Sequence, residues 1–247
     1  MERTPRDEQQ RGECGAGRLV SIRARRRALA LLGGLLVTPR AWTQAATRQS
    51  PATPFASVVP DYTLRFPHDE GSHPEFRTEW WYVTGWLESG GKPLGFQITF
   101  FRTRPELKGD NPSAFTPRQI LIAHAALSNP AHGRLQHDQR VARAGFSLAG
   151  AGQNRVDVWI DDWSLKQENG GYRARIPARD FQFDFTCSAT QPPLLQGNKG
   201  LSRKGPRPES ASYYYSLPQL KVQGILTRNG KAESVGGIAW LDHEWSS

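Results

Sequence analysis

One acidic residue of this chain stands among aromatic residues. Residues 73–87 read HPEFRTEWWYVTGWL, and Glu79 lies directly before Trp80 and Trp81. A carboxylate in apolar surroundings needs an arginine, a hydroxyl group or water beside it. Arg102, on the next predicted strand, is the natural partner, although an arginine at a strand end also suits solvent. Glu79 is therefore either a solvated charge near the start of a strand or a buried structural or catalytic acid.

Two further positions carry groups that could take part in chemistry. His124 lies in the apolar run QILIAHAALS at residues 119–128. It is either a hydrogen-bonded core group or a ligand contact or base. Asp161 and Asp162 could act as paired carboxylates, but on a short strand between two tryptophans at least one of them is expected to face solvent.

Metal and phosphate chemistry find little support in the sequence. Asp242, His243 and Glu244 are consecutive, and neighbouring strand residues point to opposite faces, so all three could not ligate one ion. We expect no metal. The loop at residues 189–210 is rich in glycine and basic residues, but its spacing fits no phosphate-binding loop and no helical pattern follows it. We therefore expect no cofactor. The chain also lacks a GxSxG-type nucleophile motif.

The basic charge of the chain is concentrated at its N-terminus. Of the net charge of +9, residues 1–48 carry +6, from ten Lys/Arg and four Asp/Glu. The remainder is too weakly basic to indicate a nucleic-acid-binding face, and we expect no nucleic-acid partner. The two cysteines are Cys14 and Cys187. Removal of the leader would leave Cys187 alone, in an apolar row that suggests an inert core thiol.

The N-terminal segment is typical of an export signal. An arginine cluster precedes the ten-residue apolar run 28–37, which is short for a membrane span. Thr43 and Ala45, on either side of Gln44, are small residues that suit a cleavage site. We predict a disordered leader with this signal over residues 1–45, a linker over 46–60 and one domain over 61–247. The protein is then periplasmic or secreted. An uncleaved membrane anchor is the alternative.

The rest of the chain alternates between apolar and polar residues with the period of a β-strand. From Thr78 onward, Trp81 and Val83 share one face and Trp80 and Tyr82 the other. Both faces carry large apolar groups, so we expect both to be covered. Further strands are predicted at 94–103, 119–128, 155–165, 172–176, 180–188, 211–217, 220–227 and 234–245, with a polar loop at 129–140. Many short strands without helical periodicity predict an all-β fold, either an antiparallel lipocalin-like (calycin-type) barrel or a strongly curved sandwich.

Six blocks of sequence, in this order, resemble one known family. They are HPEFRTEWWYVTGWL, GFQITFFRTR, IAHAALS, LLQGNKGLSRKGP, YYYSLPQLKVQG and AWLDHEW. They resemble the AttH / carotenoid 1,2-hydratase-like family of lipocalin-like, predicted secreted hydrolases. The resemblance covers residues 60–247. It implies that a second barrel of the family would be missing, so that the chain is expected to be a fragment or a truncated member.

The resemblance also implies a reaction and the residues for it. The family's hydratases add water to a terminal double bond of an acyclic carotenoid, without a cofactor, and their acid falls on Asp242, preceded by an aromatic residue at Trp240. Their pair of ring residues falls on Tyr213 and Tyr215, where hydratases are expected to carry His and Trp. Asp242 and Trp240 share one strand face, as Tyr213 and Tyr215 do, so we expect the four to line one pocket if both faces look inward. The alternative for Asp242 is a strand-end carboxylate in a structural hydrogen-bond network. With these two tyrosines, and with Glu244 where a neutral amide is typical, the chain resembles the uncharacterised secreted branch of this family more than its hydratases.

These expectations leave several functions open. The chain could be a hydratase-like or hydrolase-like enzyme acting on an isoprenoid, carotenoid or lipid, a carrier of such an apolar ligand, or an inactive fragment. The candidate ligand contacts are Glu79, Trp81, Arg102 and His124. The expected partner is an apolar small molecule, and a membrane surface is kept as a second partner.

Overall fold

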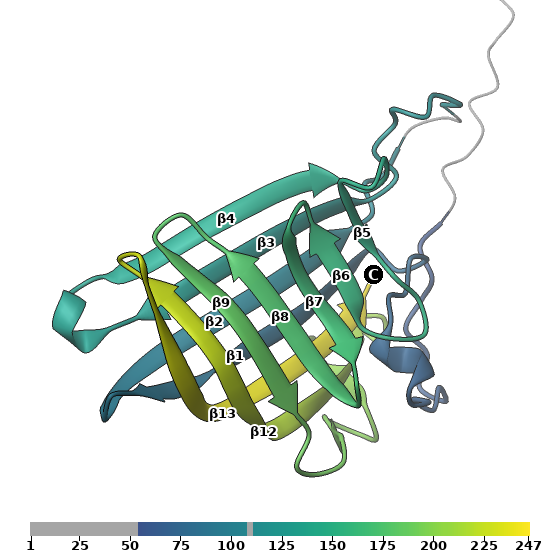
Figure 1. Ribbon diagram of the computed structural model, residues 1–247. Coiled ribbons are helices and arrows are strands. Elements are labelled where there is room, and N and C mark those ends of the chain that lie inside the picture. The colour runs from purple at the N-terminus through teal and green to yellow at the C-terminus, as the bar shows by residue number, and fades with distance from the viewer. Residues whose placement is uncertain (1–53, 108–110) are drawn as a thin grey trace, which may run out of the picture. The chain divides into compact units, whose positions relative to one another are not determined.

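A computed structural model describes residues 54–107 and 111–247 (Figure 1). The predicted leader and most of the linker lie outside these residues. The strands are β1 (Thr78–Ser89), β2 (Lys92–Thr103), β3 (Ile120–Ser128), β4 (Leu135–Arg143), β5 (Ala149–Ala151), β6 (Asp157–Ile160), β7 (Trp163–Glu168), β8 (Gly171–Pro177), β9 (Phe181–Ser188), β10 (Leu194–Leu195), β11 (Leu201–Arg203), β12 (Ala211–Arg228) and β13 (Lys231–Ser246). Two single-turn 3₁₀ helices, η1 (His68–Glu70) and η2 (Pro130–His132), are the helices of this part of the chain. None of its helices has the length and apolar character needed to span a bilayer.

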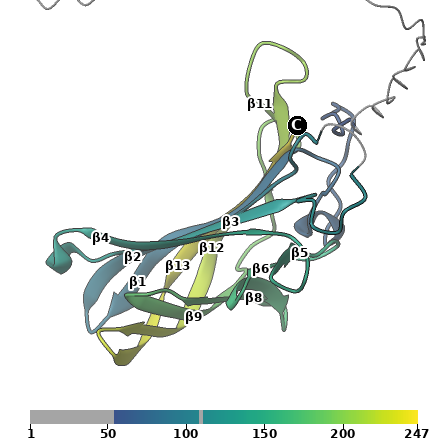
Figure 2. The same cartoon turned by 90° about the horizontal axis from the view of Figure 1, so that it is seen from above.

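All thirteen strands form one antiparallel sheet that curls into a nearly closed barrel. Its order is β4-β3-β2-β1-β13-β12-β9-β8-β7-β6-β5, with β10 and β11 paired to β12. Strands β1 to β4 and β13 form one wall, which crosses the wall of β6 to β9 at a steep angle (Figures 1 and 2). The predicted all-β barrel is confirmed.

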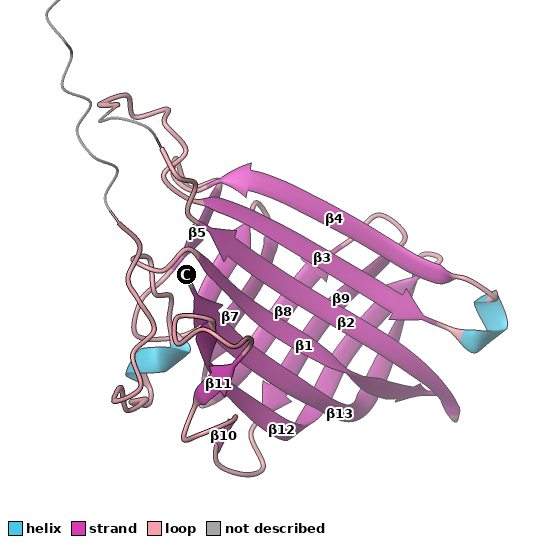
Figure 3. Ribbon diagram, turned by 180° about the vertical axis from the view of Figure 1, so that it is seen from behind, coloured by secondary structure: helices cyan, strands magenta, loops and turns pink. Residues whose placement is uncertain are grey.

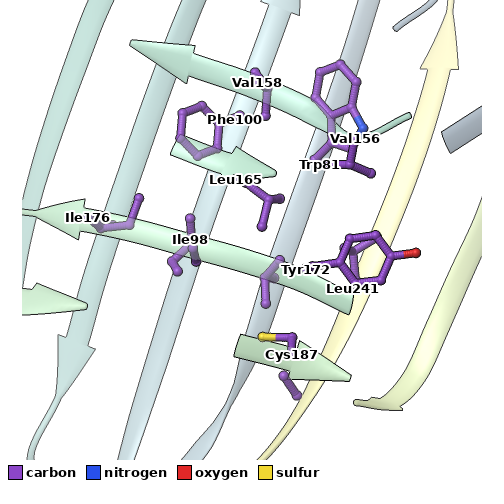
Figure 4. Packing of buried hydrophobic residues seen from close by; sticks show 14 of the residues in the cluster. Trp81, Ile98, Phe100, Val156, Val158, Leu165, Tyr172, Ile176, Cys187 and Leu241 are labelled. Atoms are coloured by element: carbon purple, nitrogen blue, oxygen red, sulfur yellow. The ribbon is translucent and has the colours of Figure 1, made fainter. Parts of the chain in front are cut away.

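The interior of the barrel is filled by the apolar rows of both walls. On β9 the burial alternates strictly, so Phe181, Phe183 and Phe185 point inward and the polar residues between them point outward. Residues of β1, β2, β7, β8 and β13 meet in the same core (Figure 4). Cys187 belongs to this core as predicted, and burial raises the pKa of its thiol to about 12.

Two predicted elements are wrong. Residues 129–140, expected as a loop, contain most of β4, an edge strand whose polar residues lie on half-exposed faces and therefore left no apolar row in the sequence. Residues 155–165, expected as one strand, form the hairpin of β6 and β7. The turn falls at Asp161, which has a φ of 53°, and Asp162. Both carboxylates are exposed at this turn, and both lie beside Arg140.

Side chains join the two edges of the sheet where no backbone ladder does. Arg140 of β4 reaches across to the β6–β7 hairpin, where its guanidinium bonds Asp162 and lies 4.8 Å from the centre of the Trp163 ring. It also donates to the carbonyl of Pro177 at 3.5 Å. Arg140 therefore bridges the seam that separates the barrel from full closure.

The segment before β1 covers one end of the barrel. Leu64, Glu70 and Phe76 are buried there. Trp81 Nε1 donates to the Glu70 carbonyl at 3.2 Å, and the hydroxyl of Tyr213 bonds the backbone of the incoming chain. Tyrosine and tryptophan side chains that point into the barrel thus hold this segment in place.

Candidate functional site

A cluster of four side chains lies on the outer face of β12 and β13. The register sets Ser216 opposite Asp242 and Tyr214 opposite Glu244, so these side chains share one face of the sheet. Asp242 Oδ1 accepts hydrogen bonds from Trp240 Nε1 at 2.5 Å, Ser216 Oγ at 2.5 Å and the Tyr214 hydroxyl at 3.0 Å. All three donors converge on Oδ1, and Oδ2 takes part in none of these bonds. The carboxylate is held in one orientation, with its second oxygen turned elsewhere.

The loop between β9 and β12 supports this cluster from one side. Strands β10 and β11 pair with β12 beside it (Figure 3). Gln196 Nε2 donates to Ser216 Oγ at 2.8 Å. Lys204 bonds Glu244 Oε1 at 2.7 Å and lies 5.0 Å from the centre of the Tyr214 ring. Burial, and then the neighbouring Asp242 carboxylate, raise the pKa of Tyr214 to about 12, so its hydroxyl stays protonated and acts as a donor.

Aromatic side chains continue from this cluster across the sheet. On β1, Tyr82 lies opposite Asp242 and Trp80 opposite Glu244, and both are half-buried. Farther along the same face, 54% of the surface of Trp86 is exposed. The expectation that both faces of β1 are covered is therefore wrong within the described chain. This outer face is an open aromatic surface with a carboxylate, Asp242, at one side.

The predicted shared pocket of Asp242, Trp240, Tyr213 and Tyr215 is wrong in its geometry. Tyr215 lies opposite His243 and Tyr213 opposite Trp245, and all four of these residues are buried inside the barrel. Asp242 faces the other way. Alternate residues of the run YYYS lie on opposite faces of the strand. The pairing of β12 with β13 places Tyr214 and Ser216 on the same face as Asp242. An irregularity in the register between Leu217 and Leu220 lies between this pairing and the rest of β12, at the break between the predicted strands 211–217 and 220–227, where Pro218 stands.

Among the buried acids near the interior tyrosines is Glu79. It is fully buried, and Arg102 Nε donates to its Oε2 at 2.8 Å. His73 Nδ1 and His243 Nε2 lie 2.7 and 2.9 Å from its Oε1. The pairing of Glu79 with Arg102 was anticipated from the sequence. Of the two histidines, His73 lies outside the strands and His243 appeared only as part of a rejected metal triplet, so neither was predicted.

The two histidines of this network carry different charges. Burial alone would lower the pKa of His73, but hydrogen bonds with Asp69 and Glu79 raise it to about 9, so His73 is a cation at neutral pH. Burial lowers the pKa of His243, which therefore stays neutral. The hydrogen bonds from both histidines outweigh burial and hold the pKa of Glu79 well below its usual range. Charges of both signs thus balance within the buried network.

This network connects the barrel wall to the segment that covers its end. Arg102 also donates to the carbonyls of His73 and Phe76, at 2.8 and 3.2 Å. The His73 ring stacks on Trp245 with 3.8 Å between centres, and Trp81 stacks on His243 at 4.8 Å. The structure therefore brings together three of the four predicted ligand contacts, Glu79, Trp81 and Arg102, in a packed interior network.

The fourth predicted ligand contact, His124, lies apart from that network. It is half-buried on the outer face of β3 and packs edge-to-face against Phe101, with 5.8 Å between ring centres. It lines a shallow pocket of about 170 Å³ together with Gln97 and His137. His124 and Glu79 thus point to opposite sides of the barrel wall.

The interior network also contains a set of three metal-type donors. One ligand atom each from His73, Glu79 and His243 lies within 4.8 Å of the others. However, Glu79 already accepts from both rings, and Arg102 adds a positive charge on the same carboxylate. The existing hydrogen bonds and the neighbouring cation make this arrangement poorly suited to a divalent ion.

Comparison with known proteins places the chain among its relatives. Residues 57–247 match the family model described as AttH-like. A crystal structure of a putative AttH from Nitrosomonas europaea is 55% identical, with a TM-score of 0.72, over 78% of this chain and 58% of that one. Kievitone hydratase from Nectria haematococca shares the fold at 16% identity, with a TM-score of 0.55, over 80% of this chain and 56% of that one. No curated protein matches. The chain spans little more than half the length of these two relatives, and it belongs to the AttH-like family.

Proposed function

We propose that the chain handles an apolar, isoprenoid- or lipid-like substrate on its outer aromatic face and that Asp242 transfers a proton there, in a hydration or hydrolysis reaction. The single observation that carries this proposal is the convergence of Trp240, Tyr214 and Ser216 on one oxygen of Asp242. A carboxyl group held in one orientation at the side of an open aromatic surface is suited to general acid–base catalysis.

For a hydration the steps balance without a cofactor. The protonated carboxyl of Asp242 gives its proton to one alkene carbon, and the other carbon becomes a cation. Aromatic faces stabilise such a cation by roughly 1–2 kcal/mol each when water is excluded. Trp240, Tyr214 and Tyr82 supply such faces beside Asp242. Water then adds to the cation, and its extra proton returns to the carboxylate.

The tight packing of the barrel interior favours the outer face as the place where a substrate binds. The interior is packed with aromatic and aliphatic side chains, among them Trp81, Phe100 and Trp163, which are almost completely buried. A ligand inside the barrel would have to displace them. The kinship with a hydratase fold supports the choice of chemistry but does not identify the substrate.

The test is incubation of the full chain with acyclic isoprenoids and unsaturated lipids in ¹⁸O-labelled water. A product that has gained one labelled oxygen supports the proposal, provided that Asp242→Asn abolishes the gain. Asp184→Asn is the matched control, since Asp184 is a carboxylate on the outer side of β9 that is paired with Arg173. Stoichiometric binding without conversion would instead identify a carrier and overturn the catalytic proposal.

A further inference from the structure

One rim of the barrel carries a row of arginines. Thr78, Thr103, Ile120 and Arg143 are successive cross-strand partners, so the start of β1, the end of β2, the start of β3 and the end of β4 lie at the same rim. Arg77, Arg104, Arg118 and Arg143 stand at or next to these strand ends. Two acidic residues, Glu75 and Glu106, lie in the same segments. The rim is therefore net positive within the described chain.

Exposed phenylalanines accompany these arginines. The rings of Phe115 and Phe146 stack with 5.5 Å between centres, although 69% and 56% of their surfaces are exposed. The guanidinium of Arg143 lies 5.0 and 4.6 Å from the two ring centres, and it donates to the Phe115 carbonyl at 3.1 Å. Phe55, which is half-buried, makes a second contact of this kind, since Arg77 and Arg104 lie 5.6 and 5.2 Å from its ring centre.

The backbone under Phe146 is unfavourable for a bulky residue. Phe146 and Ser147 have φ of 55° and 59°, and Leu148 N–H donates to the Gly145 carbonyl at 3.1 Å across them. A tight turn with two positive φ values favours Asn-Gly. Here the sequence instead sets a phenylalanine at the tip, where it protrudes, and follows the turn with the half-exposed Leu148. An apolar tip at such a position is easier to explain by contact with another apolar phase than by folding.

We infer that this rim, formed by Phe55, Phe115, Phe146, Arg77, Arg104 and Arg143, docks on the surface of an anionic lipid bilayer. Aromatic rings favour the bilayer interface, and guanidinium groups bind lipid phosphates in bidentate fashion. The surface projects from loop and hairpin tips at the end of the barrel where β4 ends (Figure 3), which suits a flat lipid surface better than a concave partner. This contact is separate from the proposed chemistry at Asp242 and does not depend on it.

The experiment is sedimentation of the full chain with vesicles of phosphatidylcholine alone or of phosphatidylcholine and phosphatidylglycerol in equal amounts. We expect preferential binding to the vesicles with phosphatidylglycerol. The double variant Phe115→Ser/Phe146→Asn should lower that binding by about tenfold or more, since binding scales with the apolar area that enters the interface. Asn favours the backbone conformation of residue 146, so this change should not impair folding. Leu135→Asn is the matched control, because Leu135 is equally exposed but lies at the opposite rim.

Hydrogen exchange on the same vesicles separates the rim from the basic N-terminal segment. The inference requires that bound vesicles slow exchange in residues 113–118 and 143–149. If the double variant binds as well as the wild type, or if these segments stay unprotected, the inference is wrong. Equal binding to both kinds of vesicle would overturn the role of the arginines. Self-association that is lost in the double variant, without vesicle binding, would assign the rim to a second copy of the chain.

Discussion

At the scale of single residues, the barrel wall separates Glu79 from Asp242, the two carboxylates that the sequence suggests as possible catalytic acids. Glu79 faces inward, where an arginine and two histidines satisfy it. Asp242 faces outward, where three neutral donors orient it next to open aromatic surface. A buried carboxylate with complete partners suits a structural role, and an oriented carboxylate on an accessible face suits chemistry. The two assignments can be tested independently.

The structural role of Glu79 predicts a large loss of stability when its charge is removed. Glu79→Gln leaves Arg102 as a buried cation without its counter-ion and leaves His73 paired with Asp69 alone, and removal of one partner of a buried pair destabilises proteins by about 3–5 kcal/mol. We expect a loss of this order in urea denaturation. The control is Asp184→Ala, which breaks the exposed pair with Arg173 and should cost less than about 1 kcal/mol. A Glu79→Gln protein as stable as the wild type would contradict the role.

The same network predicts how stability depends on pH. The pKa of His73 is raised to about 9 in the folded state, against about 6.5 in an unfolded chain. Its contribution is therefore complete below about pH 6.5 and is lost as the pH rises towards 9. The pKa of His243 is lowered, so stability also falls as the pH drops below about 6.5.

We expect maximal stability near neutral pH, with a decline on the alkaline side that His73→Gln removes. Thermal melts from about pH 5 to about pH 10 measure this curve. This interval covers the range of about pH 5–8 in which proteins are ordinarily most stable and extends beyond it on the alkaline side. His124→Gln is the control, since His124 lies outside the network. A wild-type melting temperature that stays constant from neutral pH to the alkaline limit would rule out the charged His73.

At the scale of elements, period-two alternation was sufficient to predict the central strands. The buried residues of β1, β2, β3 and β9 are those that the alternation predicts, because each strand presents one apolar face to the core. Edge strand β4 escaped prediction because its polar composition resembles a loop. The neighbours of Asp242 escaped prediction because strand register depends on pairing, and a shift of one residue exchanges the two faces.

A glycine in β1 shows how closely the central strands approach each other. A Cβ atom added to Gly85 would lie 2.3 Å from the Ile238 carbonyl oxygen and 2.8 Å from the Ala239 Cα, both backbone atoms of β13. We expect Gly85→Ala to lower the free energy of unfolding by about 1–3 kcal/mol, the ordinary effect of overpacking. At Gly236 the nearest atom to an added Cβ is 3.8 Å away. Gly236→Ala is thus the matched control, and equal losses in the two variants would contradict the argument.

At the scale of the whole molecule, the barrel is continuous except at one seam. Arg140 connects β4 with the β6–β7 hairpin through Asp162, the Trp163 ring and the Pro177 carbonyl. We expect Arg140→Ala to speed amide hydrogen exchange in β4, β5 and β6 while the central strands keep their protection. Arg175→Ala, on the outer side of β8, is the control. Unchanged exchange at both edges would show that Arg140 does not hold the seam.

The proposed function thus assigns different roles to the two faces of the barrel wall. The interior holds the fold together, and the outer face of β1, β12 and β13 presents Asp242 with its aromatic neighbours. The most direct test of this division compares Asp242→Asn with Glu79→Gln, with turnover and ligand binding measured per folded molecule on a substrate of the wild-type protein.

We predict that Asp242→Asn keeps the wild-type melting temperature and ligand affinity and loses turnover by about 10²–10⁴-fold, the usual contribution of a general acid or base. Glu79→Gln should melt earlier, while its folded fraction turns over as the wild type does. Full turnover in Asp242→Asn, or loss of turnover in folded Glu79→Gln alone, would contradict the assignment of the chemistry to the outer face.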